Sequence, residues 1–388
     1  MRLVILALCS FAVAASPAGA APRARDLGVP FDGTPGPLNA ITDVAGVLVG
    51  QTTLISGDGP LVVGKGPVRT GVTAILPRGA DSIARFSFAG WFSENGNGEM
   101  TGTTWIEESG FLEGPVMITN THSVGVVRDA VVAWRVARGP ADARGSLWSL
   151  PVVAETWDGE LNDINGFHVK QEHVFQALDS ARAGPVEEGN VGGGTGMICN
   201  GYKGGIGTSS RKLSDKDGGY TIGVLVQCNY GTRLNLRIAG IPVGREIPND
   251  DLRSSLPQDI VERGSIIVVV ATDAPLLPHQ LKRLARRVSL GLGRTGSIAG
   301  NGSGDIFVAF STANPDANAL DHVVELRMVP NDSLNPIFAA TVQATEEAVV
   351  NAMVAARDMT GIDGHHINAL PHDRLREVLR KYNRLATS

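Results

Sequence analysis

The chain has 388 residues, enough for one large or two small domains, and apart from 48 glycines and few aromatic residues its composition is that of an ordinary globular protein. Abundant glycine favours tight turns and close backbone packing over an aromatic ligand groove. The formal net charge is −5, and no basic run, zinc-finger spacing or aromatic–basic motif is present, which argues against nucleic acid as a partner.

Residues 1–20 are predicted to be a secretory signal peptide. Met1-Arg2 supplies a positive charge, residues 3–15 are almost entirely apolar, and Ala18-Gly19-Ala20 places small residues before the cleavage point. The alternative, a membrane anchor, is disfavoured because the apolar stretch is short for a bilayer and no stop-transfer pattern follows it. We therefore expect residues 21–388 to be a soluble protein in the periplasm or outside the cell, without a membrane partner.

Strand and helix patterns are mixed along residues 21–388 with no clear linker, which predicts a single domain of the α+β class. A proline- and glycine-rich leader covers 23–40, and 252–263 is expected to be an exposed loop. The β-branched run 266–272 predicts a strand buried on both faces. Strands are expected at 45–50, 72–76, 116–119, 220–227, 266–272 and 306–310, and helices at 126–137, 171–182, 279–292 and 335–361. For the last helix, Asn335 is the predicted N-cap, Pro336 the first helical residue and Gly361 the stop.

The common cofactor and metal motifs are absent from the sequence. The glycine-rich segment 189–196 matches neither a dinucleotide nor a phosphate-loop spacing, so we interpret it as a close backbone crossing. His365, His366 and His372 lack a zinc-site pattern and are expected to be solvated. No cofactor and no metal are therefore expected.

The three cysteines allow two interpretations. Cys9 leaves with the signal peptide, and an exported protein can pair Cys199 with Cys228. A large domain does not need that bond, however, and free cysteine is often buried. Two free thiols are the favoured interpretation.

Two serines deserve comparison as nucleophiles. Ser303 lies in a glycine turn that fails the outer positions of the G-x-S-x-G elbow. Ser265 follows Gly264 at the end of a polar loop and directly precedes the buried strand. If the chain were cut there, the new α-amine would titrate near neutrality and serve as the base for the Ser265 hydroxyl. A plain loop-to-strand junction remains the alternative, because Gly-Ser dipeptides recur along the chain.

Longer strings, in order along almost all of residues 21–388, are more specific than these short motifs. They are RDLG (25–28), NAITDV (39–44), PVVAET (151–156), EGNVGGGTGM (188–197), GGIGTSSR (204–211), ATDAPL (271–276) and QATEEA (343–348). The chain resembles the family of β-aminopeptidases and L-aminopeptidase/D-amidase-esterases, which are self-processing serine peptidases.

This resemblance implies a four-layer αββα sandwich of the N-terminal-nucleophile hydrolase type. It also implies cleavage of the Gly264–Ser265 bond into a larger chain, 21–264, and a smaller chain, 265–388. The two are expected to stay together and to assemble further, as a homo-oligomer of cleaved heterodimers.

The resemblance also assigns roles to individual residues. Ser265 matches the nucleophile and Asn229 the side chain that donates to the oxyanion. Glu155 matches the carboxylate that holds the substrate's ammonium group. Ser303 and Asp305 match a pair that hydrogen-bonds near the nucleophile and tunes it.

Two positions depart from the β-aminopeptidase branch. Asp305 stands where that branch carries Glu, so its contact with Ser303 or the Ser265 amine is expected to be direct, water-mediated or absent. Gly264 replaces an asparagine and is more similar to the L-aminopeptidase/D-amidase branch. These differences leave the chemistry in place but leave the choice among L-α-, D- and β-residues open.

The expected activity is release of N-terminal amino acids from small peptides, amino-acid amides or esters through an acyl-enzyme. Two alternatives remain. An N-terminal-nucleophile acyltransferase, similar to the ornithine acetyltransferases, would pass the acyl group to an amine, although those proteins use threonine. A non-catalytic periplasmic binding protein of the same fold would neither cut itself nor hydrolyse amides.

Overall fold

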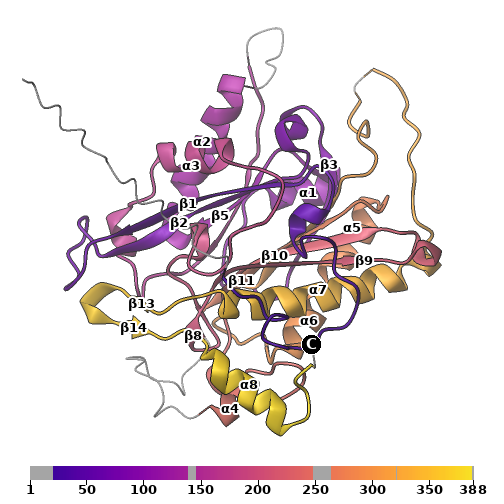
Figure 1. Cartoon of the computed structure of the whole chain (residues 1–388). Coiled ribbons are helices and arrows are strands. Elements are labelled where there is room, and N and C mark those ends of the chain that lie inside the picture. The colour runs from indigo at the N-terminus through magenta and orange to yellow at the C-terminus, as the bar shows by residue number, and fades with distance from the viewer. Residues whose placement is uncertain (1–20, 139–145, 248–263, 320, 387–388) are drawn as a thin grey trace, which may run out of the picture.

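The computed structural model describes residues 21–138, 146–247, 264–319 and 321–386. The predicted signal peptide and the predicted loop at 252–263 lie outside these residues. Two β-sheets stack face to face, and helices cover the outer face of each sheet (Figure 1). This four-layer α+β arrangement agrees with the expected sandwich.

The smaller sheet has the strand order β1-β2-β5-β6. These strands are β1 (Leu48–Ser56), β2 (Val68–Leu76), β5 (Val116–Asn120) and β6 (Val152–Thr156). The β5–β6 pair is parallel and the others are antiparallel. Its outer face packs on α2 (Val124–Arg138) and α3 (Gln171–Asp179). Helix α2 buries Val127, Val131 and Trp134, a spacing of three to four residues that places them on one stripe.

The larger sheet has the order β4-β3-β12-β11-β10-β9. Its strands are β4 (Phe111–Leu112), β3 (Ser87–Ser93), β12 (Ile306–Ser311), β11 (Ser265–Thr272), β10 (Thr221–Asn229) and β9 (Gly205–Lys212). Only β11 and β12, among the strand pairs of this sheet, run parallel. Helices α5 (Pro278–Ala285), α6 (Val288–Arg294) and α7 (Asn335–Val354) cover its outer face.

Strand β11 shows why the β-branched run folds at the centre of the sandwich. Successive side chains of a strand point to opposite faces. Ile267 and Val269 therefore join the core between the sheets, while Val268 and Val270 join the core under the helices. All residues of β11 are buried, as predicted.

The described residues also form several smaller elements. They are α1 (Thr103–Ser109), α4 (Val243–Glu246), α8 (His372–Lys381), the pair β7 (Ile198–Cys199) with β8 (Tyr202–Lys203), and the pair β13 (Met359–Thr360) with β14 (His366–Ile367). Within the described residues, no helix combines the length and the apolar character needed to cross a bilayer.

Two helix predictions were wrong in their limits. The helix expected at 279–292 is divided into α5 and α6 by a turn at Arg286 and Arg287, although the predicted apolar stripe is buried on both sides of it. Helix α7 has Leu334 as its N-cap, with Asn335 already helical, and it ends at Val354. Gly361 is not its stop. A Cβ there would lie 2.2 Å from the Leu161 carbonyl oxygen, so this glycine permits a close backbone approach.

Candidate active site

Ser265 and Asn229 are brought together by strand register. Ser265 begins β11 and Asn229 ends β10, and the two residues are partners in the antiparallel ladder. Their exposed fractions are 5% and 4%. The structure is of the uncut chain, and a Cβ on Gly264 would lie 1.9 Å from the Asn229 carbonyl oxygen. Glycine before Ser265 is therefore what allows the backbone to pass this close to β10.

The orientation of the Asn229 amide is set by backbone groups on both sides. Ile198 N–H donates to Oδ1 at 2.7 Å, and Nδ2 donates to the Trp157 carbonyl at 2.9 Å. Because an N–H must face the oxygen end of the amide, the nitrogen end is fixed toward Trp157. Nδ2 carries two hydrogens, so the side chain has the donor that an oxyanion requires.

A disulfide joins Cys199 to Cys228, so the prediction of two free thiols was wrong. The Cα atoms lie 5.5 Å apart, within the usual range for a disulfide, because β7 packs across the end of β10. Both cysteines are fully buried. They are the chain neighbours of Ile198 and Asn229, so the disulfide ties together the two segments whose hydrogen bond orients the Asn229 amide.

Removing this disulfide is expected to lower stability. The cysteines are 29 residues apart, and closing a loop of that length corresponds to about 3–4 kcal/mol in the chain-entropy description. We expect a variant with both cysteines changed to alanine to melt several degrees lower. Reductant should lower the melting temperature of wild type and leave that of the variant unchanged. Two titratable thiols in unreduced, denatured wild type would contradict the disulfide.

Ser303 and Asp305 form a buried pair beside Ser265. Ser303 Oγ donates to Asp305 Oδ1 at 2.5 Å, and Ile266 N–H donates to the same oxygen at 3.1 Å. Both side chains are fully buried. The contact between Asp305 and Ser303 is thus direct, although Asp is one methylene shorter than the Glu of the β-aminopeptidase branch. Through Ile266, the pair is fixed to the residue that follows Ser265.

Glu155 lies near the end of β6 and is buried, with an exposed fraction of 3%. Its Oε1 accepts a hydrogen bond from Glu99 N–H at 2.9 Å, and its Oε2 accepts one from Thr121 Oγ. Burial raises the pKa of Glu155, against the opposing effect of these two bonds. A buried carboxylate of this kind favours an ammonium partner, because the partner restores the charged form.

Gly98 connects Glu155 with the Ser303–Asp305 turn. A Cβ built on Gly98 would lie 3.0 Å from the Gly304 Cα and 3.3 Å from Glu155 Oε1. On the other side, the Trp157 carbonyl that accepts from Asn229 is two residues from Glu155 on the same segment. The five predicted site residues therefore surround one region where β6, β10, β11 and β12 end or begin.

Sequence reasoning missed the loop that follows β3. In this loop Asn95 Oδ1 accepts from Asp305 N–H at 2.8 Å, and Asn97 Nδ2 donates to the Gly302 carbonyl at 2.9 Å. The string ENGNGE at 94–99 is a turn signal of alternating asparagine and glycine after a strand. That signal indicates a loop but not its partner, which lies more than two hundred residues away in the chain.

The glycine-rich segment 189–196 is a close crossing between the sheets, as predicted. A Cβ on Gly193 would lie 2.2 Å from Gln227 Oε1, and one on Gly194 would lie 2.4 Å from the Ile206 backbone nitrogen. Below it Lys203, fully buried, donates to the carbonyls of Met197 and Gly204. Burial lowers the pKa of Lys203 to about 7.

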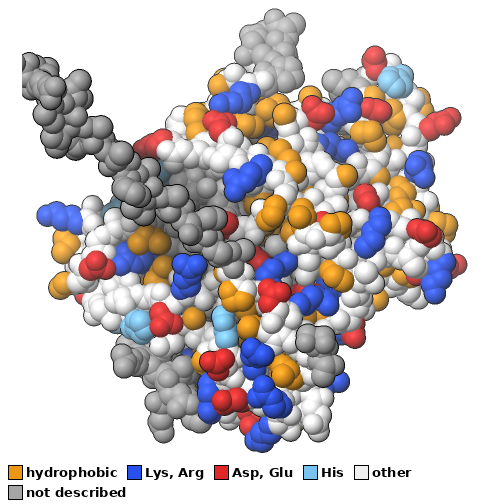
Figure 2. Space-filling view, viewed as in Figure 1, with side chains coloured by type: hydrophobic (Ala, Val, Ile, Leu, Met, Phe, Trp, Pro, Cys, Tyr) orange, Lys and Arg blue, Asp and Glu red, His pale blue; other side chains and the backbone are white. Residues whose placement is uncertain are grey.

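The three C-terminal histidines are half-buried rather than fully solvated. His365 is hydrogen-bonded to the Glu160 carbonyl, His372 to the Val354 carbonyl and His366 to the Thr360 hydroxyl, and His366 also lies 3.9 Å from the Asp358 carboxylate. Across the described ranges, no three His, Cys, Asp or Glu side chains are arranged to hold a metal ion. On the face shown in Figure 2, basic and acidic side chains are interspersed.

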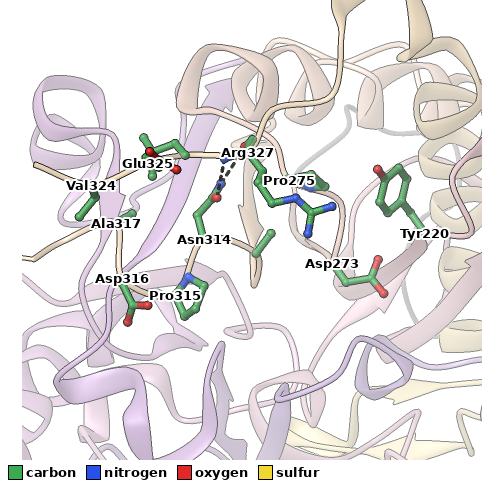
Figure 3. Close-up of a pocket in the computed structure, with 12 residues that line it drawn as sticks. Tyr220, Asp273, Pro275, Asn314, Pro315, Asp316, Ala317, Val324, Glu325 and Arg327 are labelled. Carbon is green, nitrogen blue, oxygen red and sulfur yellow. Dashed lines mark hydrogen bonds between the residues drawn. The ribbon is translucent and has the colours of Figure 1, made fainter.

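A cavity of about 440 Å³ lies elsewhere (Figure 3). Two residues that line it lie beyond the strand ends opposite to Ser265: Asp273 directly follows β11, and Asn314 lies three residues after the end of β12. Asn314 is hydrogen-bonded to the Arg327 backbone. The cavity is therefore separated from the candidate active site by the length of the central strands.

Comparison with known proteins places the chain in a known family. The model of peptidase family S58 matches residues 39–367. A β-peptidyl aminopeptidase BapA from Sphingosinicella microcystinivorans is 57% identical over 395 residues, covering 99% of this chain and 98% of the relative.

Solved structures agree. The L-aminopeptidase D-Ala-esterase/amidase from Ochrobactrum anthropi, described as a prototype for the serine aminopeptidases and a variant of the Ntn hydrolase fold, is 52% identical with a TM-score of 0.86, covering 94% of this chain and all of that one. A Burkholderia sp. β-aminopeptidase is 48% identical with a TM-score of 0.83, covering 93% and 99%. The chain therefore belongs to peptidase family S58, and it is a serine aminopeptidase with the N-terminal-nucleophile hydrolase fold.

Proposed function

We propose that the chain cuts itself between Gly264 and Ser265, and that the freed Ser265 releases N-terminal residues, β-residues included, from short peptides, amides and esters. The observation that carries this proposal is the position of Ser265. It begins the central strand and pairs with Asn229 in register. It also follows Gly264, where any larger residue would force the backbone to shift.

The proposed roles are chemically consistent with one another. The Ser265 α-amine, once free, takes the proton of the Ser265 hydroxyl as the hydroxyl attacks the substrate carbonyl. Asn229 Nδ2 donates to the oxyanion that forms, and the Ser303–Asp305 pair holds the start of β11 in place. Glu155 binds the substrate's ammonium group, which an internal peptide bond lacks, so only the first residue of a peptide is released.

The two products of the cut are expected to stay together, because strands of both are hydrogen-bonded to one another in the larger sheet. Strands β11 and β12 would belong to the smaller chain, and they lie between β3 and β10 of the larger chain. The ion pair between Arg25 and Glu347 on α7, with N···O at 2.7 Å, would also join the two chains. Separation would expose the core on both faces of β11.

A β-residue is proposed as a substrate because relatives 57% and 49% identical are named β-peptidyl aminopeptidases. The test compares p-nitroanilides of β-alanine, L-alanine and D-alanine, with N-acetyl-β-alanine p-nitroanilide as the control for the ammonium requirement. We expect turnover of the β-alanine compound and none of the acetylated one. Turnover of L-alanine alone would remove the β-residue from the proposal.

Substituting Asn229 tests the proposed oxyanion donor. We expect Asn229→Ala to lower kcat by roughly 10²- to 10³-fold with little change in KM, because the donor acts only on the charge of the transition state. Asn229→Asp is the matched control, since it keeps the oxygen that accepts from Ile198 N–H but lacks the donor. Recovery of kcat in Asn229→Asp would show that the amide only supports the fold. Both rates are normalised to the cleaved fraction.

Export and assembly belong to the same proposal. The predicted signal peptide would carry the chain to the periplasm or the medium, and the disulfide supports an oxidising compartment. We propose a homo-oligomer of cleaved heterodimers, which sedimentation of the purified protein would test. The acyltransferase alternative predicts that an added amine acceptor diverts most of the acyl product from hydrolysis.

A further inference from the structure

The carbonyl of the bond that is proposed to break already has a hydrogen-bond donor in the uncut chain. Gly304 N–H donates to the Gly264 oxygen, with N···O at 3.3 Å. Gly304 lies between Ser303 and Asp305, so this donor belongs to the same turn as the pair beside the nucleophile. Gly264 is buried, and a hydrogen bond to its oxygen there is weakly screened.

The turn that carries Gly304 is held by the loop after β3. Asn95 Nδ2 donates to the Gly300 carbonyl at 3.0 Å, and Asn97 Nδ2 donates to the Gly302 carbonyl at 2.9 Å. The backbone of the same loop adds two bonds, from Asn97 N–H to the Ser303 carbonyl and from Glu94 N–H to the Asp305 carbonyl. Four carbonyls of the turn thus accept hydrogen bonds from the loop after β3.

The loop also determines which way the Gly304 amide faces. A Cβ on Gly304 would lie 2.3 Å from the Asn97 carbonyl oxygen and 2.6 Å from the Gly98 Cα, so the loop backbone is packed directly against this residue. Asn95 Oδ1 meanwhile accepts from Asp305 N–H. With the following amide held by Asn95, the Gly304 N–H is directed across the turn to Gly264.

We propose that Asn95 and Asn97 are positioning residues that aim the Gly304 N–H at the oxyanion formed on Gly264 during self-cleavage, and at the equivalent oxyanion of the substrate. The inference rests on the proposed self-processing. Ser265 Oγ attacks the Gly264 carbonyl carbon, and the oxyanion forms on the Gly264 oxygen. The C–N bond then breaks as the nitrogen takes the proton that the Ser265 hydroxyl has lost and becomes the Ser265 α-amine. Water then hydrolyses the ester to a Gly264 carboxylate and free Ser265.

The ester formed during self-cleavage has the same reacting atoms as the acyl-enzyme formed from a substrate, because both join an acyl carbon to Ser265 Oγ. One donor aimed at the acyl oxygen therefore serves both reactions. Losing a donor of this kind typically costs about 10²- to 10³-fold in rate, and a displaced donor costs less.

The test follows self-cleavage of the full-length chain by pulse–chase synthesis and denaturing gels. We expect Asn95→Ala and Asn97→Ala to slow cleavage by about 10-fold or more each. Once matured, they should show a similar fall in kcat with KM unchanged. Asn314→Ala is the matched control, because the Asn314 side chain also forms two hydrogen bonds with the backbone of another segment, at Arg327, beyond the opposite end of β12. It should melt lower without slowing cleavage.

The outcomes separate this inference from the proposal beneath it. Wild type that stays uncut, as Ser265→Ala is expected to do, would overturn self-processing and the inference together. Wild type that is cut while Asn95→Ala and Asn97→Ala match its rate would overturn the inference alone. The inference would also be overturned if Asn314→Ala, at a melting temperature equal to that of Asn95→Ala or Asn97→Ala, cleaved itself as slowly as they do. A rise in the KM of these two variants at constant kcat would overturn it as well, since each outcome indicates a purely structural role.

Discussion

Ser265→Ala is expected to leave one uncut chain and to lower kcat/KM by at least about 10⁴-fold, because both the self-cleavage and the acyl transfer require its hydroxyl. Intact mass spectrometry and denaturing gels of the purified variant, beside wild type, would measure the first effect. In wild type we expect two fragments, the smaller one beginning at Ser265. Amide turnover by the same preparations would measure the second.

Two further variants sharpen this experiment. Ser265→Cys keeps a nucleophile at the same position and is expected to retain part of the self-cleavage. Ser333→Ala removes an exposed serine of the smaller chain and should behave as wild type. A Ser265→Ala chain that is still cut, or a wild-type fragment that begins at another residue, would assign the nucleophile elsewhere.

Glu155→Gln is expected to lower kcat/KM by roughly 10²- to 10³-fold, mainly through KM, because a buried charge-assisted bond to the substrate ammonium is lost. Gln keeps the size and an oxygen for the Glu99 N–H, so the fold should be preserved. The preference for free over acetylated amino termini should largely disappear. Glu99→Gln is the control, since Glu99 is exposed and hydrogen-bonds to Glu155 through its backbone N–H. Its negative charge helps to raise the pKa of Glu155, so this variant should lower that pKa and keep the preference for free amino termini. An unchanged preference in Glu155→Gln would place the ammonium site elsewhere.

The pH dependence gives the same prediction a sign. Only ionised Glu155 binds an ammonium group, and burial raises its pKa above the ordinary value of about 4.3. Binding is therefore lost as pH falls through that raised pKa. The Ser265 α-amine, whose pKa is ordinarily near 7.7–8.0, becomes protonated and stops acting as a base earlier in the same fall of pH. Below both, log kcat/KM of wild type should fall with a slope of two per pH unit. The slope should be one in Glu155→Gln, and a flat profile through neutral pH would contradict the amine as base.

Strand β7 links the disulfide to Asn229, the proposed oxyanion donor. Ile198 N–H orients Asn229, and its neighbour Cys199 is bonded to the neighbour of Asn229. Gly304 on β12's side and Asn229 on β10's side then flank Ser265 at the start of β11. The site thus uses the two strands that neighbour β11, one for each proposed donor.

The sequence by itself determined the features that are local. Side chains alternate across the faces of a strand, so the apolar β-branched run after Ser265 was sufficient to predict a doubly buried strand, and the strand 306–310 was predicted in the same way. The local sequence around Ser265 made it only one of the candidate nucleophiles. Its selection, and the choice of Asn229, Glu155, Ser303 and Asp305, came from strings that resemble a family over nearly the whole chain.

Only the tertiary structure decided which distant segments meet. The Asn95 and Asn97 loop reaches a turn over two hundred residues away, Cys199 reaches Cys228, and Glu155 is buried under the Glu99 backbone. Periodicity records which face of an element is apolar, but it carries no information on the register between strands or on the partner of a loop. For this reason a candidate nucleophile could be proposed from the sequence strings, whereas the groups proposed to position its donors required the fold.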